Sequence, residues 1–373
     1  MTSPLAISAD AHLNEPLELY ERLPRGYQDR APRVANIGGE PHMIVEGQPP
    51  RPLNAPNPLT EDDMQRYWRE ESDSELGRVF HRAGGTDVQL RLKDQDADGI
   101  RAEVIYPHGT FNTFTSTDSG FQLALARLYN DYYHEIFGAY PDRFAVSAVI
   151  PLHDIDQAIR EASRVAKMGF RSLSIPIDIP ALPYNMPEYD PFWATVEELG
   201  IPLALHIFTE AEHSTANEPR RAMPGEDLAF EIIDQAAAMK PMCLFIASGV
   251  LERFPRLKFV LVECGIGWLA WVLQTLDQIN DKRHMWIQPK LELKPSEYFK
   301  RQGAATFCDD EIGLANRHLT GVGSLLWGND YPHDEGTFPH SREVIDRVFK
   351  GVDETDRHKI LIQNSAELYG FPL

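Results

Sequence analysis

Near its start, the sequence places an aspartate and a histidine two residues apart. A short apolar run over residues 7–12 ends in Asp10 and His12. Because successive side chains of a β-strand point to opposite faces, these two would project from the same face of an extended strand. A carboxylate oxygen and a neutral imidazole nitrogen together suit a divalent ion such as zinc, manganese or iron. A helix-capping Asp beside a surface His is the alternative interpretation.

Further acidic and imidazole side chains follow other apolar runs. These are His108 after residues 100–107, His206 in residues 200–207, Glu263 in residues 257–263, and Asp330 in residues 324–330 with His333 just beyond. Singly, each could cap a helix or bind a loop amide. Together they could supply the several ligands and the base around one open coordination position that metal-dependent hydrolysis requires.

The elements that must position these side chains alternate along the chain. From residue 98 onward, short apolar runs alternate with amphipathic segments, which is typical of parallel β/α units. After the opening strand we expect strands at residues 100–107, 144–151, 169–176, 200–207, 257–263, 304–308 and 324–330. We expect helices at residues 120–140, 154–168, 189–199, 227–253 (one or two), 267–279, 341–349 and 356–368.

Eight strands in one domain predict the α/β class, with a single (β/α)8 TIM barrel over residues 1–373. In such a barrel, polar residues at the C-terminal ends of the strands meet at one rim. An open doubly wound sheet is the competing fold. It would more often carry a Gly-rich nucleotide loop, and the sequence has no G-x-G-x-x-G run.

A Pro- and charge-rich stretch, residues 24–95, separates the opening strand from the rest. Its Pro-rich runs at residues 48–52 and 54–58 argue against regular elements. Within it, residues 61–83 could add a helix or two. A connection of this length in a compact domain is typically a lid or an inserted subdomain. We therefore expect an insertion after the first strand that covers the site or a subunit contact.

Composition narrows the classes of partner. The 373 residues carry 36 basic and 56 acidic side chains, a formal net charge of −20. Nucleic acids and anionic membranes would be repelled, so a small-molecule substrate is predicted. Cys243, Cys264 and Cys308 show no C-x-x-C spacing, which fits a reducing cytoplasm rather than a disulfide framework. We find neither a signal-peptide pattern nor an apolar run of transmembrane length.

Several runs together resemble a known family. The D-x-H pair, the E-C-G-I-G-W run at residues 263–268, the G-N-D-Y-P-H run at residues 328–333 and the N-S-A-E-L-Y-G run at residues 364–370 are similar to the amidohydrolase-related (amidohydrolase 2) family. That family includes aminocarboxymuconate-semialdehyde decarboxylase, resorcylate-type aromatic decarboxylases and hydrolases. The resemblance implies one divalent metal ion per chain, zinc or alternatively manganese or iron. The ligands that it implies are Asp10, His12, His206 and Asp330.

The sequence departs from the decarboxylase pattern at the sixth strand, where Glu263 replaces a catalytic histidine. A carboxylate does not offer an imidazole's proton near neutral pH unless its pKa is raised. The fourth strand, residues 169–176, also lacks a lysine that could be carbamylated to bridge two metals. We therefore predict a cytoplasmic, mononuclear, metal-dependent hydrolase of a small organic substrate. Its candidate catalytic residues are Asp330, Glu263 and His333, with His108 as a further candidate.

Two other functions stay open. One is a non-oxidative decarboxylase (carboxy-lyase) of an aromatic or unsaturated acid, in which Asp330 would protonate the carbon. The other is a non-catalytic barrel that binds a ligand. Aromatic residues near the proposed rim would suit a flat or apolar substrate. For at least half of them, packing in the core or in loops is the expected role. These aromatic residues are Tyr106, Phe111, Phe114, Phe208, Trp268, Trp327, Tyr331 and Phe338.

A homodimer is also predicted. The resemblance is one reason, and the insertion gives the other. Its apolar residues Tyr67, Trp68 and Phe80 need a surface to pack against.

Overall fold

Eight parallel strands form the centre of the computed structural model, which describes residues 5–52, 82–179, 182–209, 225–333 and 335–373. They are β1 (Ala6–Leu13), β5 (Ile100–Pro107), β6 (Phe144–Val149), β7 (Ser172–Ile175), β8 (Leu203–His206), β9 (Phe259–Val262), β10 (Gly303–Phe307) and β11 (Leu325–Trp327). Each strand pairs in parallel with the next along the chain. The predicted (β/α)8 barrel is confirmed.

The first and last strands meet and close the barrel. Ala11 forms a parallel bridge with Tyr331, and the His12 N–H donates to the Tyr331 carbonyl oxygen at 2.7 Å. The Asp330 N–H likewise donates to the Asp10 carbonyl oxygen at 3.0 Å. At Gly328 an added Cβ would lie 2.6 Å from the Asp10 Cβ, so a side chain there would push β11 away from β1. Closure therefore brings the D-x-H pair beside the G-N-D-Y-P-H run.

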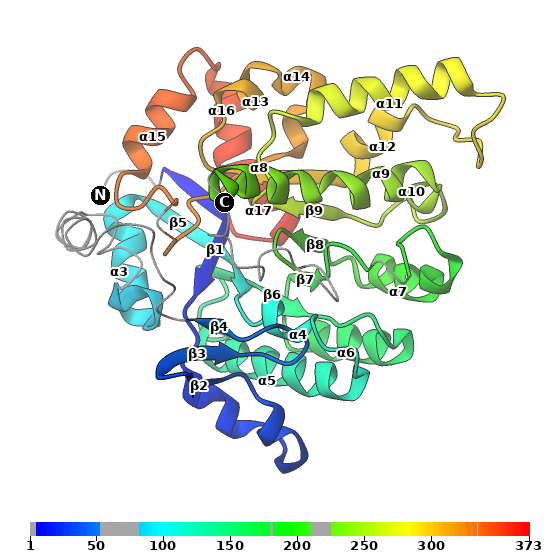
Figure 1. Cartoon of the computed structure of the whole chain (residues 1–373). Coiled ribbons are helices and arrows are strands. Elements are labelled where there is room, and N and C mark those ends of the chain that lie inside the picture. The colour runs from blue at the N-terminus through cyan, green and yellow to red at the C-terminus, as the bar shows by residue number, and fades with distance from the viewer. Residues whose placement is uncertain (1–4, 53–81, 180–181, 210–224, 334) are drawn as a thin grey trace.

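Helices surround the strands (Figure 1). They are α3 (Val88–Asp98), α4 (Thr110–Thr113), α5 (Ser119–Phe137), α6 (Ile155–Lys167), α7 (Asp190–Leu199), α8 (Glu226–Ala237), α9 (Met239–Ala247), α10 (Val250–Arg253), α11 (Leu269–Arg283), α12 (Pro295–Gln302), α13 (Glu311–Ala315), α14 (Arg317–Thr320), α15 (Ser341–Val348), α16 (Glu354–His358) and α17 (Asn364–Tyr369). Asp154 caps α6 by accepting the Gln157 N–H at 2.9 Å. Residues 227–253 form three helices instead of the predicted one or two, because Gly249 in a left-handed conformation ends α9 and begins α10. Among the described residues, no helix combines the length and apolarity that crossing a membrane requires.

Two hydrophobic clusters occupy the two faces of the strands. Ile105 packs in the larger cluster, which also contains Trp193 and Phe245 from the helices. Val104, the neighbouring residue on β5, packs in the smaller cluster, which consists of strand residues and the C-terminal segment ending at Phe371. The smaller cluster therefore fills the barrel interior, and the larger one joins the barrel to its helices.

The insertion after β1 is partly regular. Its described residues include two 3-10 helices, Leu17–Arg22 and Arg25–Arg30, and an antiparallel sheet of β2 (Arg33–Ile37), β3 (Glu40–Ile44) and β4 (Arg51–Pro52). The prediction that the Pro-rich runs exclude regular structure was wrong at β4, because an edge strand tolerates proline.

The boundaries of the insertion also differ from the prediction. The helix α3 begins at Val88, so the last residues of the range 24–95 already belong to a helix of the barrel. Thr115 donates to the Glu46 carbonyl oxygen at 2.9 Å, and Arg30 pairs with Asp118 at 2.7 Å. The small sheet therefore lies against the start of α5, as Figure 1 shows. Residues 53–81, with Tyr67, Trp68 and Phe80, lie outside the described residues.

Candidate metal centre

Side chains from four strand ends converge at one rim of the barrel. His12 Nε2 lies 3.3 Å from His206 Nε2, 3.3 Å from Asp330 Oδ1 and 3.7 Å from Asp10 Oδ1. His206 Nε2 lies 3.8 Å from Asp10 Oδ1 and 3.2 Å from Glu263 Oε2. Asp10 and His12, two residues apart on β1, therefore project to the same side as the spacing predicts. Possible ligand atoms of Asp10, His12, His206 and Glu263 all lie within 4.8 Å of one another, and those of His12, Glu263, Asp330 and His333 form an overlapping group.

Both imidazoles are oriented by main-chain carbonyl groups. His12 Nδ1 lies 3.0 Å from the Tyr106 carbonyl oxygen, and His206 Nδ1 lies 2.8 Å from that of Ile207. A carbonyl oxygen only accepts, so each Nδ1 carries the proton and each Nε2 presents its lone pair to the centre. Burial lowers the pKa of His12 well below its usual range and that of His206 to about 4. Both rings are thus neutral near neutral pH, as a metal ligand must be.

The carboxylates of Asp10 and Asp330 point into the same space. Among the described residues, the buried Oδ1 atoms of both accept no hydrogen bond. Thr306 donates to the other oxygen of Asp10 at 3.1 Å. Burial, and then the charge of Asp330, raise the pKa of Asp10 well above its ordinary value. A buried carboxylate oxygen without a hydrogen-bond donor is costly, which favours a cation beside Asp10 Oδ1. Asp330 Oδ1 lies 3.3 Å from His12 Nε2 and forms an ion pair with His333 Nδ1 at 3.0 Å. The donor set of Asp10, His12, His206 and Asp330 fits a divalent ion.

His333 and His108 extend the centre toward solvent. His333 Nδ1 lies 3.1 Å from Asp330 Oδ2, and His333 Nε2 lies 2.7 Å from His108 Nε2. His108 Nδ1 lies 3.1 Å from the Leu13 carbonyl oxygen, which leaves its Nε2 to accept from His333. Burial lowers the pKa of His333, but the charge of Asp330 and the hydrogen bond to it prevail and raise that pKa to about 9. His333 therefore keeps a proton beside Asp330 at neutral pH.

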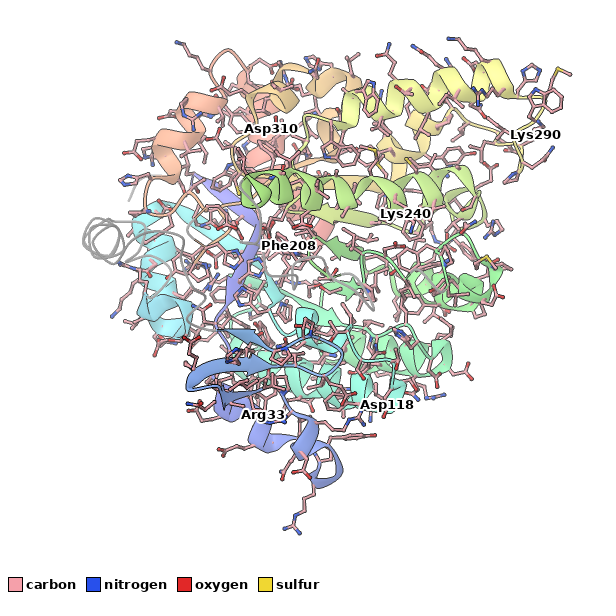
Figure 2. All side chains as sticks on the ribbon, viewed as in Figure 1. Arg33, Asp118, Phe208, Lys240, Lys290 and Asp310 are labelled. Carbon is pink, nitrogen blue, oxygen red and sulfur yellow. The ribbon has the colours of Figure 1, made fainter. Side chains whose placement is uncertain are left out.

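Three residues just beyond strand ends adopt left-handed backbone conformations. Phe208 follows β8 with φ 62°, Glu263 follows β9 with φ 61°, and Asp330 lies beyond β11 with φ 51°. Each such residue costs about 1–3 kcal/mol when it is not glycine, and they cluster at functional sites. In Figure 2, Phe208 lies near the middle of the molecule, beside the strands. Two of the three residues, Glu263 and Asp330, themselves place carboxylate oxygens beside His12.

Most of the predicted rim aromatics serve packing. Five are buried: Tyr106, Phe114, Trp327, Tyr331 and Phe338. Phe208 and Trp268 are partly exposed, so they remain able to contact a substrate. The side chain of Phe111 lies outside the described residues.

Two residues that the sequence pattern did not mark also build the centre. Thr306 on β10 accepts the Glu263 N–H at 2.7 Å and donates to Asp10. The buried Arg91 on α3 donates to the His12 carbonyl oxygen and pairs with Glu103 on β5 at 2.6 Å. Thr306 does not end an apolar run, and Arg91 falls within the range 24–95, so neither gave a signal at a strand end.

Known proteins resemble this chain in sequence and in fold. A family model described as amidohydrolase matches residues 108–371. A gamma-resorcylate decarboxylase of Rhizobium sp. (strain MTP-10005) is 26% identical over 331 residues, covering 81% of this chain and 90% of the relative. A solved amidohydrolase from Mycobacterium avium subsp. paratuberculosis K-10 has a TM-score of 0.76 at 21% identity, covering 99% of this chain and 100% of that one.

A solved dihydroxybenzoic acid decarboxylase from Polaromonas sp. JS666, with bound manganese and the inhibitor 2-nitroresorcinol, has a TM-score of 0.64 at 20% identity, covering 99% of this chain and 97% of that one. At these identities the two solved structures show a shared fold. The family model, in contrast, matches more than half of the sequence, including the E-C-G-I-G-W and G-N-D-Y-P-H runs. The chain therefore belongs to the amidohydrolase family, as those runs predicted.

Proposed function

We propose that the protein is a metal-dependent, non-oxidative decarboxylase of a hydroxylated aromatic carboxylic acid. The observation that carries this proposal is the pairing of Asp330 with His333, which places a proton source beside the implied metal ligands. The gamma-resorcylate decarboxylase of Rhizobium supports the same reaction class. The hydrolase that the sequence predicts first becomes the second candidate.

The residues of the centre can perform the proton transfer. Decarboxylation breaks the bond between the ring carbon and the carboxylate carbon, and the electron pair stays on the ring carbon, which must then take a proton. A bound divalent ion would orient the acid and polarise its oxygens. His333 Nδ1 lies 3.0 Å from Asp330 Oδ1 and 3.1 Å from its Oδ2, so Asp330 can pass a proton from His333 to the carbon. His108 holds the far side of His333 at 2.7 Å.

The identity of the ion is part of the proposal. From the sequence, zinc comes first, with manganese or iron as alternatives. Manganese is bound in the Polaromonas decarboxylase, which supports manganese for this chain. Both ions accept imidazole and carboxylate ligands, so the four implied ligands alone do not separate them.

The reaction can be tested directly. Protein loaded with manganese is incubated with gamma-resorcylate and with other mono- and dihydroxybenzoates, and released carbon dioxide is measured together with loss of the acid. We expect release that stops after the metal is removed with a chelator and returns when manganese is added back. Absence of carbon dioxide from the whole set would contradict the proposal.

Hydrolysis remains the second candidate because Glu263 occupies the position of the expected histidine. A carboxylate at this position could accept a proton from an attacking water. A parallel set of esters, amides and lactones, assayed with the same metal-loaded protein, separates the two reactions. Metal binding without turnover in either set would favour the third possibility, a barrel that binds a ligand without catalysis.

A further inference from the structure

Glu263 lies as close to the imidazoles of the centre as an implied ligand does. Its Oε2 is 3.2 Å from His206 Nε2 and 3.8 Å from His12 Nε2. The corresponding distances for Asp10 Oδ1 are 3.8 Å and 3.7 Å. Two atoms bound to one ion at about 2.1 Å lie roughly 3.0–3.4 Å apart, depending on the angle. The position of Glu263 therefore agrees with that of a ligand to the same ion.

The Nε2 atom of His206 faces Glu263 Oε2 directly. The His206 Nδ1–H is committed to the Ile207 carbonyl oxygen at 2.8 Å, so Nε2 presents a lone pair. A carboxylate oxygen at 3.2 Å from that lone pair is repelled unless a cation lies between them. A separation this short also leaves no room for a water molecule between the two atoms.

The backbone directs Glu263 to this position. The residue adopts φ 61°, a left-handed conformation that disfavours a glutamate. Its N–H donates to Thr306 Oγ1 at 2.7 Å, and the same hydroxyl donates to Asp10 Oδ2 at 3.1 Å. One threonine thus ties the main chain of Glu263 to the carboxylate of an implied ligand.

The loop after Glu263 is held independently. Asp310, labelled in Figure 2, accepts the N–H groups of Ile266 at 2.7 Å and Gly267 at 2.6 Å. Thr306 and Asp310 together hold the chain on both sides of the turn that aims Glu263 inward.

We propose that Glu263 is a fifth protein ligand of the metal ion, and that the resulting set of three carboxylates and two imidazoles favours manganese relative to zinc. The carboxylates are Asp10, Glu263 and Asp330, and the imidazoles are His12 and His206. Zinc sites in proteins usually have four ligands, whereas manganese accepts six and suits carboxylate oxygen. Five protein ligands leave one position for a water or a single substrate oxygen.

A set of five protein ligands is compatible with either decarboxylation or hydrolysis. It also changes the role expected for Glu263 from general base to ligand, because Asp330, unlike Glu263, has the protonated His333 beside it to supply a proton. The proton chemistry then falls to Asp330 and His333. Three carboxylates around a divalent ion also leave the set with one net negative charge, in place of the neutral set that two carboxylates would give.

Metal titrations of variants test the proposal without any substrate. Dissociation constants for manganese and zinc are measured by chelator competition for the wild type, Glu263→Gln and Glu263→Asp. We expect Glu263→Gln to weaken manganese binding by roughly 10- to 100-fold, the scale of altered metal sites. Zinc binding should weaken less, because zinc can remain with four ligands. Zinc keeps the higher affinity in most sites of this kind, so the change in the ratio of the two constants is the decisive quantity.

The matched control is Asp310→Asn, which loosens the same loop but leaves the centre's carboxylates in place. Its ratio of manganese to zinc dissociation constants should equal that of the wild type. An unchanged ratio in Glu263→Gln, or the same change in Asp310→Asn, would overturn the proposal.

A crystal structure of the manganese-loaded wild type decides the question even if the variants do not fold. A bond from Glu263 to the ion of about 2.0–2.2 Å supports the proposal, and a carboxylate turned away from the ion refutes it.

Discussion

Asp330 is the residue on which the proposed chemistry depends most. Its Oδ1 lies 3.3 Å from His12 Nε2, and its Oδ2 lies 3.1 Å from His333 Nδ1. It thus contacts both the implied metal ligands and the imidazolium that can resupply its proton. Its left-handed backbone, φ 51°, is one that asparagine also adopts with little strain, so an amide can replace the carboxylate without moving the chain.

We predict that Asp330→Asn retains part or all of the metal while turnover falls by roughly 100-fold or more, the scale of a lost acid or base. The amide keeps an oxygen ligand but does not carry the proton. Metal content and initial rates on a proven substrate are measured for the wild type and the variant. His206→Ala is the contrasting variant, which should lose most of the metal. Near-wild-type turnover in Asp330→Asn would move the proton transfer to another group.

Asp10 links metal binding to pH. Burial and the charge of Asp330 raise its pKa, so the metal-free protein holds a proton there at pH values where an ordinary aspartate has lost it. Metal binding must displace that proton, so affinity should rise with pH until the raised pKa is passed. His206, with a pKa of about 4, does not compete with the metal above mildly acidic pH.

We therefore predict that manganese binding releases protons from mildly acidic solution up to the raised pKa of Asp10, and that Asp10→Asn releases fewer. Calorimetric titrations in two buffers of different ionisation enthalpy give the number of protons released per ion bound. Equal proton release from the wild type and Asp10→Asn would show that another group supplies the proton.

Among the elements, the seam between β1 and β11 positions the centre. The main-chain bonds that join Asp330 to Asp10 and His12 to Tyr331 form this seam. Arg91 on α3 reinforces it. The guanidinium donates to the carbonyl oxygens of His12 and Tyr331, lies 4.7 Å from the centroid of the Tyr331 ring and pairs with Glu103. This arginine is fully buried, so its charge relies on these partners.

We predict that Arg91→Met lowers the free energy of unfolding by about 3–5 kcal/mol, because it leaves Glu103 buried without its partner. The double variant Arg91→Met, Glu103→Met should recover much of that loss. It should not recover manganese affinity, because the carbonyl groups of the seam still lack their donor. Urea unfolding and metal titration measure the two properties separately. Recovery of both would show that Arg91 acts only through its ion pair with Glu103.

At the scale of the whole molecule, exposed apolar side chains indicate that the chain associates with a second copy of itself. The helix α11 and the segment after it expose large apolar side chains, with Trp271 at 62%, Met285 at 73% and Trp286 at 81% of full exposure. Aromatic side chains bury on the order of 150–250 Å² each, so these residues would supply part of the roughly 800 Å² that each partner of a standard interface buries. We propose that a second copy of the chain covers it.

We predict by light scattering a particle of about twice the chain mass of 42.3 kDa. Trp271→Glu and Trp286→Glu should shift the particle toward the monomer, because each places a charge in the interface. Val34→Glu, at an exposed apolar position on β2, is the control and should leave the mass unchanged. A monomer mass for the wild type across a wide concentration range would rule out the dimer.

The sequence was sufficient for the barrel and for most of the centre. Strand periodicity places Asp10 and His12 on one face, and apolar runs ending in His206, Glu263 and Asp330 place those residues at strand ends. Both patterns are local. The eight-stranded barrel then follows from element order, because parallel strands joined by helices bring all of their C-terminal ends to one rim. The candidate rim residues were therefore identifiable before any contact was known, and the family resemblance implied which of them are ligands.

The tertiary structure decided how the side chains meet. The 2.7 Å contact of His108 with His333, the anchoring of Asp10 by Thr306 and the burial of Arg91 behind the seam join residues far apart in the chain. Local patterns carry no record of such contacts, because they depend on barrel closure and on the left-handed turns at Glu263 and Asp330. A sequence pattern identifies a strand end, but the backbone conformation beyond that end sets the direction of the side chain.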